Sequence, residues 1–299
     1  MRVINLITSC YQVSDIEKLK DAGAGSVILG MPFFSVRSTS HFTKEELKEA
    51  VALCHQLNMN AYVLVNRFFV EEELAQLHEV MLFLKSLCVD GIYFTDMGVF
   101  YEAQELQMEH LMIYNPDTIL TNSCDVNAYL SLGMKMCTLA KEITLEEILC
   151  IAKQVQGEME IIVHGRLNMM HSKRNLLTNY MQFLNKDKSV RDRYDLYLME
   201  ENREEHMPIV EDEHGTHVFT GFTLCSLEEV EDLVQSGIHH LRIEGMWSTI
   251  TQLCEVVMDY RKVIENPERG RAMFQKYEKK YPDQNITKGF LYKKTGLLK

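Results

Sequence analysis

The chain has 299 residues, of which 46% are hydrophobic and 25% charged, and this ordinary globular composition excludes general disorder. Its formal net charge of −12 at pH 7 repels polyphosphate at long range, so we do not expect the whole surface to bind DNA or RNA strongly. A local basic patch is compatible with this charge, and the densest candidates are Arg166, Lys173 and Arg174, and the C-terminal Lys288, Lys293, Lys294 and Lys299.

Short apolar or β-branched runs alternate with longer amphipathic runs, a pattern typical of β–α–β units and a parallel sheet. A small residue usually follows each amphipathic run, where Gly adopts a positive φ at little cost. We predict eight strands, at residues 3–7, 26–29, 61–65, 91–94, 111–114, 135–139, 160–163 and 239–243.

Three of the intervening helices begin with the same local signal. A Ser or Thr stands three residues before a Glu at Thr43, Thr144 and Ser226, which predicts a capping box at each position. The acidic residues that follow also suit the positive end of the helix dipole.

The repetition of one β–α unit about every thirty residues favours closure into a TIM-like (β/α)8 barrel over residues 1–270. The alternative is an open, doubly wound sheet, although no GxGxxG motif follows the first strand.

Two segments depart from the repeat. Residues 194–224 alternate apolar and polar side chains around a turn at 213–215, which predicts an antiparallel β-hairpin inserted before the last barrel strand. Residues 271–299 are rich in Lys and Tyr, and we expect them to form a short C-terminal tail.

The first nine residues are too short an apolar run for a secretion signal, and nowhere do about 18 apolar residues follow one another. We therefore expect a cytoplasmic protein without a membrane span. None of the eight cysteines forms a CxxC pair, so we interpret them mainly as buried small hydrophobic residues.

The carboxyl ends of barrel strands form the mouth where active sites lie, so candidate site residues are sought just after each predicted strand. These positions are polar and mixed in charge, which suits an anionic or hydrogen-bonding ligand. We predict catalytic roles for His164 and Glu244 and no metal site. The predicted substrate-binding residues are Asn66, Arg67, Asp96, Asn122, Arg166, Lys173 and Arg174.

The segment His164-Gly165-Arg166 is the most suggestive, because Gly permits close backbone approach beside a titratable imidazole and a fork-shaped anion receptor. The structural alternative is a histidine held by a neighbouring carbonyl and an arginine paired with an acid. Glu244 has a similar alternative, an ion pair with Arg67 or Arg166.

Asn66, Asp96 and Asn122 have the alternative role of helix caps. His214 and His217 have a spacing found in metal sites, but we interpret them, with the neighbouring acids Glu211 and Glu213, as a solvated charge cluster.

The motifs of common hydrolases are not legible in the sequence. There is no HExxH of zinc peptidases, no GxSxG elbow, and no cysteine in a papain-like or caspase-like context. A peptidase therefore remains an alternative without a visible nucleophile.

Several stretches together resemble the collagenase-like peptidase U32 family, in the expected order over about residues 1–265. They include VDGIYFTDMGV at 89–99, LAKEITLEEI at 139–148, VHG at 163–165 and LRIEG at 241–245, and the matches at 41–51, 61–66 and 289–295 are shorter. The chain resembles the shorter of two paralogues that some bacteria encode side by side.

This resemblance implies a contribution to 5-hydroxylation of the transfer-RNA wobble uridine, in a complex with a longer U32 paralogue and with tRNA. Two alternatives are a collagenase-like peptidase and a non-catalytic partner subunit. Better-known members hold an iron–sulfur cluster through cysteines shortly after the HG motif, but residues 167–175 contain none here, so the cofactor is left unassigned. Met246 also replaces an Arg that the family often has after Glu-Gly.

Overall fold

The computed structural model describes residues 3–186, 188–199, 201 and 205–293. Residues 1–2 of the predicted barrel, 294–299 of the predicted tail, and 187, 200 and 202–204 lie outside the described residues.

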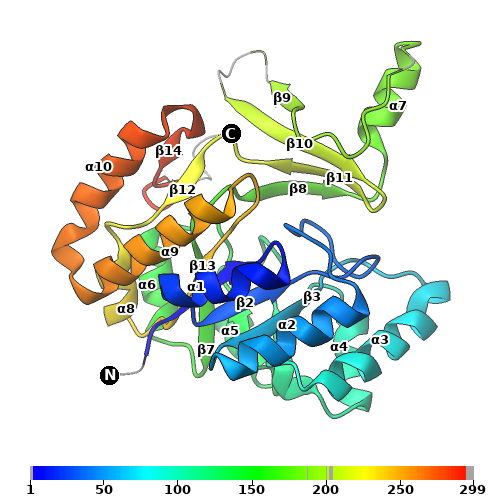
Figure 1. Cartoon of the computed structure of the whole chain (residues 1–299), viewed down its shortest axis with the longest axis horizontal. Coiled ribbons are helices and arrows are strands. Elements are labelled where there is room, and N and C mark those ends of the chain that lie inside the picture. Colours follow the sequence, from blue (N-terminus) through cyan, green and yellow to red (C-terminus); the bar gives the residue numbers. More distant parts are fainter. Residues whose placement is uncertain (1–2, 187, 200, 202–204, 294–299) are drawn as a thin grey trace.

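Eight parallel strands of the described chain close into a barrel, which confirms the TIM-like fold and excludes the open sheet (Figure 1). Strand β1 pairs with both β2 and β13, and β13 pairs in turn with β7, so no edge is left between the first and last strands. Every strand bound lies within two residues of its prediction. The strands are β1 (Asn5–Ser9), β2 (Ser26–Leu29), β3 (Asn60–Val65), β4 (Gly91–Phe94), β5 (Met112–Tyr114), β6 (Met136–Thr138), β7 (Glu158–Gly165) and β13 (His240–Ile243).

The helices of the repeat pack around the barrel and bury an apolar stripe against it. Among the described residues, no helix combines the length and apolar character needed to cross a bilayer. The helices are α1 (Ile16–Ala22), α2 (Lys44–Gln56), α3 (Leu74–Leu87), α4 (Met97–Glu105), α5 (Ser123–Leu130), α6 (Leu145–Ala152), α8 (Val230–Gln235) and α9 (Ile250–Glu265). Short 3-10 turns lie at Val13–Asp15, Glu71–Glu73, Glu109–Leu111, Pro267–Arg269 and Pro282–Gln284.

Two of the three predicted capping boxes are confirmed. The Thr43 and Thr144 hydroxyls each accept a hydrogen bond from the backbone N–H three residues on, and the Glu carboxylate there accepts one from the Thr N–H. The box predicted at Ser226 is wrong, because the Ser226 N–H bonds the Val163 carbonyl and helix α8 begins only at Val230.

The barrel interior holds both apolar and charged side chains. A cluster with members from β1 to β6 includes Ile7, Leu64 and Ile113, together with the rings of Tyr62 and Tyr93. The charged side chains Glu160 and Arg242, on β7 and β13, are also buried. Polar residues therefore occupy part of the space that packed aliphatic layers fill in most such barrels.

The excursion between β7 and β13 is larger than the predicted hairpin. The hairpin forms β10 (His206–Asp212) and β11 (Gly215–Phe219), flanked by β8 (Asn168–Ser172) and β9 (Tyr197–Met199) in one antiparallel sheet. The helix α7 (Leu176–Phe183) extends away from the barrel beside it, and β12 (Thr223–Cys225) returns antiparallel to β7 (Figure 1). We call β8, α7 and β9–β11 the insertion.

The described part of the predicted tail packs against the barrel. Helix α10 (Gly270–Lys280) buries Phe274 and Tyr277, and the Lys276 Nζ lies 2.7 Å from the buried Asp259 carboxylate on α9. Strand β14 (Ile286–Thr287) then pairs parallel to β12. Residues 271–293 are thus a structural part of the domain.

The packing of α10 predicts how two substitutions change the free energy of unfolding. We expect Phe274→Ala to lower the free energy of unfolding by about 3 kcal/mol, because a buried ring leaves a cavity. The matched substitution Phe183→Ala, at a ring that is 81% exposed on α7, should change it by less than about 0.5 kcal/mol. Urea unfolding measures both, and equal small effects would show that α10 does not stabilise the fold.

Candidate functional site

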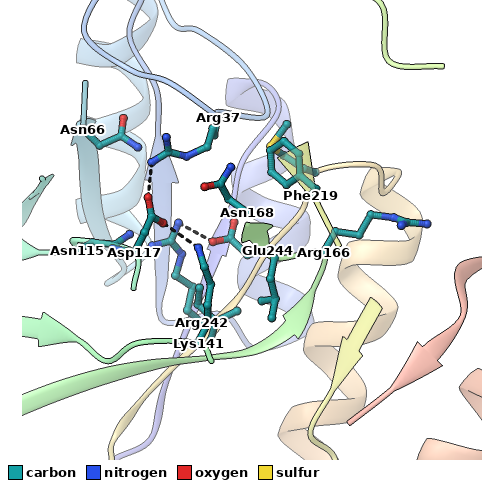
Figure 2. A pocket seen from close by; sticks show the side chains of 13 residues that line it. Arg37, Asn66, Asn115, Asp117, Lys141, Arg166, Asn168, Phe219, Arg242 and Glu244 are labelled. Atoms are coloured by element: carbon teal, nitrogen blue, oxygen red, sulfur yellow. Dashed lines mark hydrogen bonds and ion pairs between the residues drawn. The ribbon is translucent and has the colours of Figure 1, made fainter. Parts of the chain in front are cut away.

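A polar pocket of about 430 Å³, including its opening, lies at the carboxyl ends of the barrel strands (Figure 2). Residues after β2, β3, β5 and β6 supply part of its wall, and β7, β13, the residues that follow these two strands, and the insertion supply the rest. The lining residues are Arg37, Asn66, Asn115, Asp117, Lys141, Ile162, Arg166, Leu167, Asn168, Phe219, Arg242, Glu244 and Met246.

Asp117 is the centre of one ion-pair group. Its two carboxylate oxygens lie 2.8 Å from the Arg37 guanidinium and 2.9 Å from the Lys141 Nζ (Figure 2). Burial alone would raise the pKa of Asp117, but the two cations outweigh it and lower the pKa to about 2. Burial lowers the pKa of Lys141, and Asp117 opposes that shift. The loops after β2, β5 and β6 are therefore held together by charge.

Arg242 is the centre of a second group, deeper in the barrel. Its Nη2 lies 2.6 Å from Glu244, its Nη1 lies 3.6 Å from the fully buried Glu160, and the guanidinium is 4.9 Å from the Tyr93 ring. Glu160 also accepts hydrogen bonds from the hydroxyls of Tyr93 and Thr138. Burial raises the pKa of Glu160, and Arg242 opposes the rise.

Two donor atoms of the Arg242 guanidinium make no hydrogen bond. Within the described part of the chain, its buried Nε and Nη1 atoms have no hydrogen-bond partner. Buried nitrogen donors are almost always bonded in folded proteins, to protein, water or ligand. With Arg37 and Lys141 beside it, the pocket offers cationic donors that suit a small anionic or hydrogen-bonding molecule.

Glu244 lines the pocket, as the strand-end argument requires, but its partner is Arg242 rather than Arg67 or Arg166. Asn66 also lines the pocket, and its amide clamps the Val36 backbone by accepting from the N–H at 2.9 Å and donating to the carbonyl at 3.1 Å. Arg166 reaches away from the ion pairs and donates to the Thr220 carbonyl at 2.8 Å (Figure 2).

His164 lies outside the pocket lining. Its ring is buried between Tyr260 and Tyr277, with both ring centroids 5.7 Å away. Burial lowers the pKa of His164 to about 3, so the imidazole is neutral at physiological pH. This position separates the His164 side chain from the ion pairs, and no catalytic role for it enters our proposal.

The backbone of the same segment has a clear role. The His164 carbonyl accepts from the Glu244 N–H at 2.9 Å. Gly165 has φ +111, and a Cβ there would lie 2.6 Å from the Glu244 carbonyl oxygen. The His-Gly pair therefore allows β7 and β13 to approach closely where Glu244 enters the pocket.

Arg67 and Lys173 line a separate hollow beside the insertion. The Arg67 guanidinium pairs with Glu73 at 2.5 Å and covers the Phe33 ring at 3.9 Å, while Lys173 donates to the Phe68 carbonyl at 3.3 Å. Arg174 is exposed and lines neither cavity.

Asp96 and Asn122 occupy N-cap positions. Asp96 accepts from the Gly98 N–H and the Phe69 N–H, both at 2.9 Å, and begins α4. Asn122 accepts from the Asp125 N–H at 3.0 Å and begins α5. Both lie where a helix starts rather than among the ion pairs.

Sequence reasoning did not assign Arg37, Asp117 or Arg242 to the site. Lys141, two residues after the predicted strand 135–139, is one of the strand-end positions but was given no role. Arg242 carries another legible signal, a charge flanked by Leu241 and Ile243 inside a strand, which points to a buried polar position. Arg37 and Asp117 lie on loops 80 residues apart, and only the fold shows that they pair.

The predicted solvated cluster is wrong for Glu211 and His217, which are both buried. Glu211 accepts hydrogen bonds from the Leu177 and Thr178 N–H groups. The His217 ring stacks on His171 with centroids 4.7 Å apart and lies 3.3 Å from Asp212. Burial, helped by His217, lowers the pKa of His171 to about 4.

The residues present do not fit an iron–sulfur cluster of the kind the resemblance implies. The eight cysteines are unpaired, and Cys10, Cys54, Cys137 and Cys225 are each buried at different strands or helices. In the described ranges no group of three or more His, Cys, Asp and Glu side chains is arranged to hold a metal ion.

Comparison with known proteins gives consistent matches. The family model described as peptidase family U32 matches residues 12–298. The tRNA hydroxylation protein P2 of Bacillus subtilis (strain 168) is 29% identical over 99% of both chains. The P1 protein of the same strain is 27% identical over 84% of this chain and 61% of its own length. The P protein of Escherichia coli K12 is 26% identical over 83% and 65%.

A solved structure, the U32 peptidase Mk0906, superposes with a TM-score of 0.52 at 11% identity, covering 82% of this chain and 93% of that one. This likeness shows the fold alone.

The Asp117 ion pairs predict a pH dependence of stability. Because the folded-state pKa of about 2 lies below the usual 3.8, Asp117 stabilises the fold above pH 3.8, and this stabilisation is lost as the pH falls towards 2. Between pH 5 and pH 2 the loss should be about 2 kcal/mol larger in the native chain than in Asp117→Asn. Urea unfolding at each pH measures it. Asp21→Asn, at an exposed position on α1, is the control, and equal losses in all three chains would contradict the ion-pair account.

Proposed function

This chain belongs to peptidase family U32, and from that membership and the geometry of its barrel mouth we propose that it contributes to 5-hydroxylation of the transfer-RNA wobble uridine. The observation that carries the proposal is the similarity to tRNA hydroxylation protein P2, which extends over 99% of both chains. A match over the whole length includes the barrel and the insertion, the elements that line the pocket.

The polar pocket is the proposed working site. Arg37, Lys141 and Arg242 supply positive charge against Asp117 and Glu244, and the free Arg242 donors are available to a small anionic co-substrate. The ion pairs hold these groups before any ligand arrives, which reduces the reorganisation needed on binding.

A peptidase is less well supported by the groups that are present. Burial raises the pKa of the thiols of Cys10, Cys54, Cys137 and Cys225 to about 12, which suppresses the thiolate needed for attack. His164 is enclosed by tyrosine rings away from the pocket. These groups favour a structural role over a nucleophile and base.

Nucleoside mass spectrometry of transfer RNA tests the proposal. In a strain that lacks the gene, we expect 5-hydroxyuridine derivatives to disappear and the native chain to restore them. Arg37→Gln should restore them about tenfold less well or worse, because it removes a pocket cation while Lys141 still pairs with Asp117. Tyr101→Ala, on the outer helix α4, is the control.

Unchanged hydroxyuridine in the deletion strain would overturn the proposal. Full restoration by a folded Arg37→Gln chain would instead show that the pocket is not the working site and favour a non-catalytic subunit.

We also propose that the chain works with a longer U32 paralogue. Bacillus subtilis has both a P1 and a P2 relative, and this chain covers nearly all of P2 but 61% of P1. An affinity-tagged chain should therefore co-purify the longer paralogue from its native host in a near-equal amount. Native chain that purifies without any second family member would contradict a stable complex.

A further inference from the structure

A second cavity adjoins the polar pocket, between the insertion and the barrel mouth. It measures about 970 Å³ including its opening, and it shares Arg166 and Met246 with the polar pocket. Tyr194, Tyr197, His206 and Trp247 contribute rings to its wall. We call this cavity the aromatic cleft.

Trp247 is the chain's single tryptophan, and its backbone is held in an uncommon conformation with φ +64. A bulky residue keeps this left-handed conformation only where its surroundings hold it. The Tyr11 hydroxyl lies 2.6 Å from the Gly245 carbonyl and 2.7 Å from the Ser248 carbonyl, which fixes the loop. The indole also meets the Phe219 ring edge-on, at 4.5 Å between centroids. The indole is therefore pre-positioned in the cleft.

The two tyrosines keep much of their surface in solvent although they are flat and largely apolar. Tyr194 is 55% and Tyr197 58% exposed. Tyr197 stacks on His206 with centroids 5.2 Å apart and an interplanar angle of 16°. Flat exposed rings in a cleft are the surfaces on which nucleobases stack, whatever their sequence.

Arg166 adds a charge to the cleft. Its guanidinium points away from the ion pairs of the polar pocket and makes a hydrogen bond with the Thr220 carbonyl (Figure 2). A guanidinium with further donors suits a phosphate oxygen or a base edge. Asp283 also lines the cleft, so the charge that would favour an anionic phosphate is that of Arg166.

Charge is distributed unevenly along the insertion. Residues 173–193 contain six Lys and Arg against two Asp, and residues 194–219 contain one Arg against eight Asp and Glu. Among the described residues that line the cleft, Arg166 is the one Lys or Arg side chain. A cation beside aromatic rings is a combination found in single-stranded nucleic-acid sites.

We infer that the aromatic cleft binds an unstacked base of single-stranded RNA, with Arg166 at its phosphate or base edge. The inference rests on the proposed function, since a base that is to be hydroxylated must leave its stack to reach an enzyme pocket. The cleft stands beside the polar pocket and shares a wall with it, so a base held there lies next to the proposed working site.

Trp247 provides a direct optical test, because all tryptophan fluorescence of the chain arises in the cleft. We expect a synthetic anticodon stem–loop RNA to quench this fluorescence in a saturable way when titrated into the full chain. Tyr197→Ala and Arg166→Gln should each raise the Kd about tenfold, and Tyr197→Phe should retain most of the affinity. Tyr101→Ala and Phe183→Ala, at exposed rings outside the cleft, should bind like the native chain.

Anisotropy of a labelled stem–loop provides the second measurement. If RNA binds by anisotropy but neither quenches Trp247 nor responds to Tyr197→Ala and Arg166→Gln, the cleft is not the RNA site and the inference is overturned. The absence of any RNA binding overturns it as well, and so does quenching by a partner protein alone. In each case nucleoside analysis of the deletion strain still decides the proposed function independently.

Discussion

The site depends on one buried charge, that of Arg242. A guanidinium inside a barrel is costly to desolvate, and Glu160 and Glu244 offset that cost from opposite sides along the barrel axis. Glu160 is in turn fixed by hydroxyls from β4 and β6, so four strands converge on one carboxylate. The orientation of Arg242 thus follows from barrel closure, and the position of Glu244 follows from Arg242.

This arrangement explains why the mouth is polar without being loosely ordered. The Asp117 group joins the loops after β2, β5 and β6, and the Arg242 group joins the strands beneath them. Each group pairs its cations with carboxylates, so little uncompensated charge is buried where the two groups lie side by side. In the described residues the Arg242 Nε and Nη1 atoms make no hydrogen bond, and a ligand that bonded them would remove the cost of leaving buried donors unsatisfied.

How much the sequence predicts follows from the range of the interactions. Strand positions and the caps at Thr43 and Thr144 depend on neighbours within a few residues, and both were predicted closely. The pairing of Arg37 with Asp117 depends on closure of the barrel, and no local pattern reveals it. A histidine beside glycine suggests chemistry in the sequence, and the structure shows that the backbone of that segment also brings β7 and β13 together.

The insertion shows a different limit. Strand β8 is half-exposed and lacks an apolar alternation, and α7 buries none of its side chains, so neither has a clear sequence signal. These elements nevertheless place Tyr194 and Tyr197 in the cleft beside the polar pocket. The net charge gives no sign of this cleft, because an overall −12 suggests that RNA is repelled. At physiological salt, charges act over only about 8 Å, so acids on the outer helices hardly oppose the positive charge of Arg166. A chain that is acidic as a whole can therefore present RNA with an aromatic cleft that carries a cation and adjoins an ion-paired pocket.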